Sequence, residues 1–126
     1  EKVIHTPTAD PFSENLRGLI IDSAKKLDLK YHPKGTVITI EGPRFSTRAE
    51  SHMFRMFGAD VINMSTVPEV FLAKELEMEY ATVAMSTDYD CWKENEEPVT
   101  FEMVLEIYKK NSENVKKLIV ETIPKI

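Results

Sequence analysis

Two carboxylate residues, Asp88 and Asp90, directly follow a largely apolar segment at positions 81–87. This segment is typical of a buried strand, and open α/β sheets bind their ligands beyond the carboxyl ends of such strands. Two carboxylates separated by one residue can contact two polar atoms on one edge of a flat ligand, such as the ring nitrogen and exocyclic amine of a purine. The alternative is that both are ordinary turn residues, because aspartate forms local hydrogen bonds in loops.

A further candidate lies at the end of another predicted strand, at positions 61–64. The helix that follows would return the chain to the 81–87 strand, so we expect the two strands to be parallel and to end at the same edge. Ser65 would lie at that edge, at a helix N-terminus whose free N–H groups favour an anion. Ser65 is therefore a candidate anion ligand, whereas helix capping alone explains Thr66.

Strands and helices alternate along the chain, which predicts an α/β fold with helices packed on a sheet. The β-branched run at 36–40 predicts a third strand, and we expect all three strands in one sheet. Capping residues predict four helix starts, at Ser13, Thr47, Thr66 and Thr100. Thr47 and Thr66 each precede a glutamate by three positions, which is the spacing of a capping box.

The composition is typical of one soluble domain, since 42% of the 126 residues are hydrophobic. A net charge of −5 argues against nonspecific binding to nucleic acid. No apolar run is long enough to span a membrane, and no signal peptide is apparent. Cys91 is the single cysteine and cannot form an internal disulfide, which predicts a reducing compartment, most simply the cytoplasm. His32 and His52 lack partners at metal-ligand spacing, so we expect no metal site.

Three motifs carry a resemblance to a known family. They are Glu-Gly-Pro-Arg-Phe at 41–45, the stretch 58–70, and Ser-Thr-Asp-Tyr-Asp-Cys-Trp at 86–92. With them the chain resembles the purine nucleoside phosphorylase family, and within it the branch that cleaves 5′-methylthioadenosine. The resemblance implies the nucleoside phosphorylase fold, with a mixed, largely parallel sheet flanked by helices. It also implies that residues 1–126 are a single α/β unit, the C-terminal half of a larger phosphorylase domain.

The resemblance implies a reaction as well. Phosphate, as co-substrate, would attack the ribose C1′ of 5′-methylthioadenosine, and this pentosyl transfer would give adenine and 5-methylthioribose 1-phosphate without a cofactor. Asp88 would protonate or hydrogen-bond purine N7 as the catalytic acid, which requires a raised pKa in a closed site. Asp90 would accept a hydrogen bond from the 6-amino group of adenine.

The same resemblance implies further contacts with substrate. Phe45 would pack on the purine face, Ile62 would line the pocket, and Met64 would lie along the ribose. Ser65 would bind phosphate. His5 would reach the 5′ pocket of a neighbouring subunit in a homotrimer. The last helix would line that pocket with Phe101, Val104 and Leu105.

Two departures from the oxopurine enzymes of the family indicate adenine as the base. Those enzymes have a glutamate where this chain has Ser46, and an asparagine where it has Asp88. A carboxylate accepts a hydrogen bond from an amine, whereas an amide can donate one to a 6-oxo group. The apolar last helix suits a methylthio group, although Phe101 is bulkier than the small aliphatic residue expected there.

Two alternatives stay open. One is a hydrolytic methylthioadenosine nucleosidase of the same fold, in which water replaces phosphate, although the candidate anion ligand Ser65 argues against it. The other is a non-catalytic fragment that serves only as an assembly half. The four glycines form no phosphate-binding cluster of the kind that the family uses. We therefore expect the isolated chain to be inactive without the N-terminal half, as part of the same or a separate chain.

Overall fold

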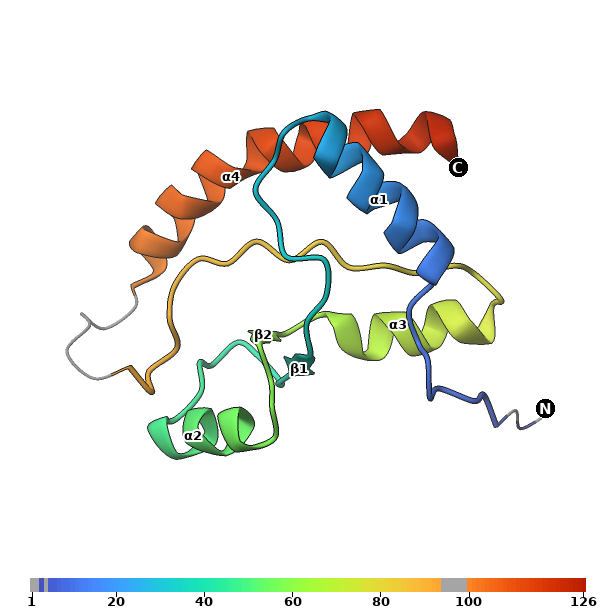
Figure 1. Ribbon diagram of the computed structural model, residues 1–126. Helices are drawn as coiled ribbons and strands as arrows, with labels where there is room; N and C mark the ends of the chain where they lie inside the picture. Colours follow the sequence, from blue (N-terminus) through green and yellow to red (C-terminus); the bar gives the residue numbers. More distant parts are fainter. Residues whose placement is uncertain (1–2, 4, 94–99) are drawn as a thin grey trace.

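The computed structural model describes residues 3, 5–93 and 100–126. In Figure 1, an extended segment at about 80–90 passes between α1 and α4 on one side and the strands, α2 and α3 on the other. The elements, in chain order, are α1 (Glu14–Lys26), β1 (Val37–Thr39), α2 (Arg48–Met56), β2 (Val61–Asn63), α3 (Thr66–Glu75), α4 (Phe101–Thr122) and the short 3₁₀ helix η1 (Ile123–Lys125). In the part of the chain that the structure describes, no helix is both long enough and apolar enough to cross a membrane.

The sheet contains two parallel strands, β1 and β2, among the described residues. Ile38 pairs with Ile62 at the centre of the register. One further backbone bond, from Ile40 N to Asn63 O at 2.9 Å, extends the ladder. The helix α2 connects the two strands, as expected for a parallel pair. The strands predicted at 36–40 and 61–64 are confirmed, and so is the α/β fold class.

The strand predicted at 81–87 is wrong. The segment has no regular secondary structure, and neither β1 nor β2 pairs with it. A strand is defined by hydrogen bonds to a neighbour, and the described residues place no strand beside this segment. The single sheet of three strands is therefore not formed. The sequence carried the apolar pattern of a covered strand, but Val83 is exposed here.

Three of the four predicted helix starts have the expected caps. The hydroxyl oxygens of Ser13, Thr47 and Thr100 accept hydrogen bonds from backbone N–H groups three residues later, at 3.0, 3.2 and 3.2 Å. Thr47 and Glu50 form the predicted capping box. At the other end of α2, Gly58 has a φ of +78°, the left-handed conformation that glycine adopts most easily after a helix.

The capping box predicted at Thr66 and Glu69 is not formed, although α3 does begin at Thr66. Val67 has φ −106° and ψ 127°, because a residue that precedes proline is driven out of the helical region. The Thr66 hydroxyl instead accepts a hydrogen bond from the Asn63 amide. The Glu69 carboxylate accepts one from the hydroxyl of Tyr80 at 2.7 Å.

The buried core is small. The helices α1 and α4 pack together, and each contributes one buried apolar residue, Ala24 and Leu118. Large apolar side chains remain in solvent elsewhere, such as Met56 at 79% and Leu76 at 71% exposed. Extended apolar surface of this kind marks an interaction site or an aggregation risk in a folded protein.

Candidate functional site

The loop before α2 passes close to the end of β2. An added Cβ on Gly42 would lie 2.7 Å from the sulfur of Met64. Only glycine lets the backbone approach this side chain without displacing it. The structure therefore brings Met64, the predicted ribose neighbour, next to the loop that carries Phe45.

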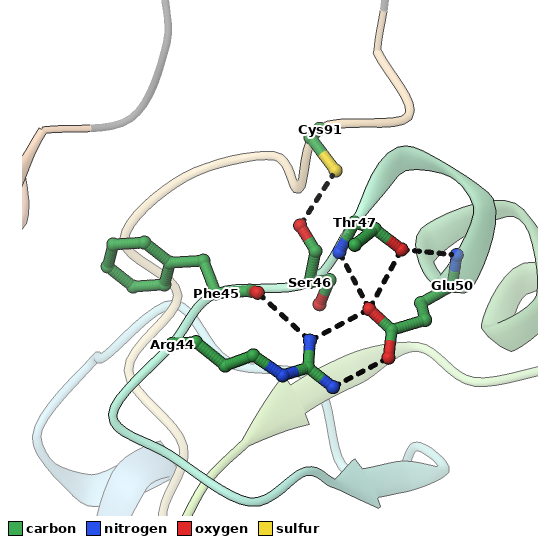
Figure 2. Close-up of polar contacts among 6 residues, drawn as sticks. All are labelled: Arg44, Phe45, Ser46, Thr47, Glu50 and Cys91. Carbon is green, nitrogen blue, oxygen red and sulfur yellow. Dashed lines mark hydrogen bonds and ion pairs between the residues drawn. The ribbon is translucent and has the colours of Figure 1, made fainter.

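An ion pair fixes the backbone around Phe45, as Figure 2 shows. The Arg44 guanidinium donates to the two carboxylate oxygens of Glu50 at 2.8 and 2.6 Å. The same guanidinium donates to the Phe45 carbonyl at 3.2 Å. In Figure 2 the Phe45 ring points away from these polar groups, and the residue is 57% exposed. The Phe45 backbone is thus held in place, while its exposed ring offers a face on which a flat base can stack.

The Glu50 carboxylate is the centre of this network. The pKa of Glu50 is lowered from 4.5 to about 2, most of all by the hydrogen bond from Arg44 and next by the backbone N–H and hydroxyl of Thr47. Thr47 contributes two hydrogen bonds of 2.8 Å each. Glu50 is therefore ionised at neutral pH and holds the Phe45 loop to the first turn of α2.

We expect Glu50→Gln to lower the thermal unfolding midpoint by a few degrees at pH 7. Because the folded-state pKa of Glu50 is depressed, its carboxylate stabilises the fold above its ordinary pKa of 4.5. That contribution is lost as the pH falls through about 2, so the difference between variant and parent should disappear there. This difference in midpoint is measured by thermal melts followed by circular dichroism between pH 2 and 7.

A matched control is Glu113→Gln on α4. Glu113 also has a lowered pKa, because Lys116 lies 2.7 Å away. It belongs to an exposed pair within one helix, and such pairs contribute little to stability. Its substitution should leave the midpoint almost unchanged at every pH. A Glu50→Gln deficit that does not depend on pH would contradict the role given to the Glu50 charge.

The two candidate carboxylates lie at the end of the extended segment, where the Lys93 backbone N–H donates to the Asp90 carbonyl at 3.2 Å and closes a turn; we call residues 88–92 the carboxylate turn. Thr87 Oγ1 donates to Asp88 Oδ1 at 2.6 Å, and Asp88 is exposed. The Cys91 backbone N–H donates to Asp90 Oδ1 at 2.9 Å. This second bond is the local type that turn-forming aspartates make, so the alternative interpretation describes part of what Asp90 does. Asp90 also lines a shallow hollow together with Ile62, so the structure does bring these two predicted residues together.

Ser65 is exposed at the start of α3, and its side chain makes no capping hydrogen bond. The chain turns a corner between the end of β2 and the start of α3. Sequence reasoning missed the residue whose hydrogen bonds fix this corner, Asn63. The Asn63 amide oxygen accepts from Thr39 Oγ1 at 2.9 Å and from Thr66 N at 3.4 Å. The Asn63 amide nitrogen donates to the Thr66 hydroxyl. A polar residue at the last position of an otherwise apolar strand was the signal available in the sequence.

The remaining predicted residues do not join this cluster. Figure 1 places the N-terminal segment, which contains the exposed His5, at the opposite side of the molecule from the 88–92 turn. The start of α4 lies apart from both strands in the same view. Phe101 is 65% exposed there, beside the half-buried Val104 and the exposed Leu105. Their roles in a 5′ pocket stay predictions. Among the described residues, no cluster of three or more His, Cys, Asp or Glu side chains could hold a metal ion.

Comparison with known proteins gives a consistent result. The chain is 56% identical over 124 residues to the S-methyl-5′-thioadenosine phosphorylase of Xenopus tropicalis, covering 98% of this chain and 44% of that enzyme. It is also 56% identical over 125 residues to the enzyme of the same name from Pyrococcus abyssi, with 99% and 48% covered. The solved methylthioadenosine phosphorylase of Schistosoma mansoni, in complex with adenine, superposes with a TM-score of 0.94 at 38% identity, over 98% of this chain and 49% of that one.

The chain thus spans about half the length of the relatives that it matches. The resemblance drawn from the sequence motifs is confirmed, and so is the nucleoside phosphorylase fold, of which this chain forms a part. The family model described as the phosphorylase superfamily matches residues 2–124. This chain belongs to the phosphorylase superfamily.

Proposed function

We propose that the chain is the base-binding part of an enzyme that cleaves 5′-methylthioadenosine with phosphate, giving adenine and 5-methylthioribose 1-phosphate. The observation that carries this proposal is the identity of more than half of the residues, over nearly the whole chain, with S-methyl-5′-thioadenosine phosphorylases from a vertebrate and an archaeon. We further propose that the chain corresponds to the C-terminal half of such an enzyme.

The base would bind between the Phe45 ring and the carboxylate turn. Asp90 would accept from the 6-amino group through the carboxylate oxygen that does not bond Cys91. Asp88 would act at N7, where negative charge develops as the glycosidic bond breaks. A proton or hydrogen bond placed there stabilises the leaving purine. Asp88 must be protonated to donate, and it is exposed in this chain, so the rest of the enzyme would have to cover it.

Phosphate would bind at the corner that Asn63 fixes. Ser65 offers a hydroxyl, and the N-terminus of α3 a partial positive charge, to an anion. Met64 would lie between this corner and the base, along the ribose. Basic phosphate ligands would come from the N-terminal half of the enzyme, and His5 would act across a subunit boundary in a homotrimer. Phe101, Val104 and Leu105 would close the 5′ pocket in that assembly.

The test is the phosphate dependence of adenine release. The chain is combined with the part of the Pyrococcus abyssi enzyme that it does not match, supplied as a second polypeptide. We expect adenine to form only when phosphate is added, together with 5-methylthioribose 1-phosphate detected by mass spectrometry. Phosphate-independent release with free 5-methylthioribose as the product would instead identify the hydrolytic nucleosidase.

A further inference from the structure

The loop that carries Phe45 and the turn that carries Asp88 and Asp90 meet at Cys91. The Cys91 thiol donates to the Ser46 carbonyl at 3.4 Å, as Figure 2 shows. In addition, a guanidinium nitrogen of Arg48 donates to the Cys91 carbonyl at 2.7 Å. Cys91 is thus bonded at both its side chain and its backbone to the entry of α2, although more than forty positions separate it from Ser46 and Arg48 in the sequence.

The helix α2 contacts the next residue of the turn as well. The Arg55 guanidinium lies 3.7 Å from the centre of the Trp92 ring, within the range of a cation–π contact. Arg48 and Arg55 lie at the two ends of α2, and the capping box fixes the end nearer Phe45. The turn therefore rests against a helix whose own start is held in place.

The protonation state of Cys91 matches this arrangement. Burial raises the pKa of the Cys91 thiol, and the nearby Asp90 carboxylate raises it further. The thiol therefore keeps its proton at neutral pH and can donate to the Ser46 carbonyl. A thiolate has no proton to donate, so this environment favours a structural bond over nucleophilic chemistry.

We propose that Arg48 and Cys91 form a clasp, by which we mean these two residues and their bonds to each other and to Ser46. The clasp sets the distance between the stacking ring of Phe45 and the carboxylate turn. Both loops would contact the same base, so this consequence rests on the proposed function. Binding groups on loops need such support, because small displacements are enough to weaken a site. Arg48 carries most of the effect, since a hydrogen bond from a charged donor is stronger than one from a thiol.

The first test needs no catalytic activity. Trp92 is the single tryptophan of the chain, so its fluorescence reports on the turn alone. We expect Arg48→Ala to shift the Trp92 emission to longer wavelength and to increase quenching by acrylamide, because the turn moves away from α2. The matched control is Arg17→Ala, since Arg17 on α1 also donates to a backbone carbonyl, that of Pro33 at 2.9 Å. An unchanged emission in Arg48→Ala would overturn the clasp.

The second test uses the active combination with the complementary polypeptide. Arg48→Ala should raise KM for 5′-methylthioadenosine about tenfold, the effect of losing one charge-assisted hydrogen bond. KM for phosphate should not change, and Arg48→Lys should restore part of the loss because lysine keeps one charged donor. A fall in kcat with both KM values unchanged would indicate only less folded enzyme and would overturn the positioning role. If Trp92 responds but no adenine is released even by the parent, the clasp stands and the proposed function fails.

Discussion

The chain on its own is expected to release no measurable adenine from 5′-methylthioadenosine, even in excess phosphate. Phosphorolysis requires phosphate to be held beside the ribose, and within the described residues the anion site that we propose consists of Ser65 and the start of α3. A helix N-terminus contributes only about 0.3–1 kcal/mol to anion binding when it is exposed. An arginine clamp with two charged hydrogen bonds is much stronger. The isolated chain should therefore lack the bound nucleophile.

Adding the complementary polypeptide should produce activity of at least a million-fold over the uncatalysed rate, the lower end of what enzymes achieve. The measurement is adenine release followed by absorbance or chromatography, with mass spectrometry to show which polypeptides are present. Asp88→Ala with the same complement is the negative control. Robust phosphate-dependent release by the purified chain, free of any second polypeptide, would falsify the expectation.

The same addition should stabilise the chain. Large apolar side chains are exposed on several elements, among them Met56 on α2 and Ile119 on α4. A partner that covers them binds the folded form only, and binding at about one hundred times Kd stabilises by ~2.7 kcal/mol. The thermal midpoint should rise with the concentration of the complement. Activity without such a rise would indicate that the two polypeptides meet only transiently.

Features set by neighbouring residues could be predicted from the sequence. The caps at Ser13, Thr47 and Thr100 depend on a hydroxyl and a backbone N–H three positions away, and all three are formed. The 81–87 segment shows the opposite case. Its apolar pattern is that of a covered strand, but a strand also needs a hydrogen-bonding neighbour, and none is present among the described residues. Local sequence contains no information on whether that neighbour is there.

In the candidate site, too, residues in continuous motifs could be predicted, whereas residues whose roles depend on distant contacts could not. Phe45 and the Asp88–Asp90 pair stand in continuous motifs, so sequence reasoning found them. Sequence reasoning did not identify Asn63 and Arg48. Their roles depend on hydrogen bonds with Thr39 and Cys91, which are far away in the sequence. At Thr66 the capping-box spacing gave a wrong prediction. Pro68 forces Val67 out of the helical conformation, and the capping box is not formed.

The base preference should change in Asp88→Asn. The substitution keeps the size of the side chain, and the amide oxygen can still accept from the Thr87 hydroxyl, as Asp88 Oδ1 does at 2.6 Å. The new amide nitrogen would then take the position of the second carboxylate oxygen. Its N–H groups can donate to N7 and to a 6-oxo group but not to the 6-amino group of adenine, which is itself a donor, and this favours a 6-oxopurine over adenine. It cannot supply the proton that a carboxylic acid gives to N7.

We therefore expect kcat/KM for 5′-methylthioadenosine to fall by about a hundredfold or more, the usual contribution of a general acid. The ratio of kcat/KM for inosine to that for 5′-methylthioadenosine should rise at least about tenfold, since a site with mismatched hydrogen-bonding groups discriminates strongly. Both values are measured in the combination with the complementary polypeptide. Asp22→Asn is the matched control, because Asp22 is an exposed aspartate on α1 that pairs with Lys25. An unchanged ratio in Asp88→Asn would contradict a role of Asp88 in base recognition, and of the two carboxylates Asp90 alone would keep that role.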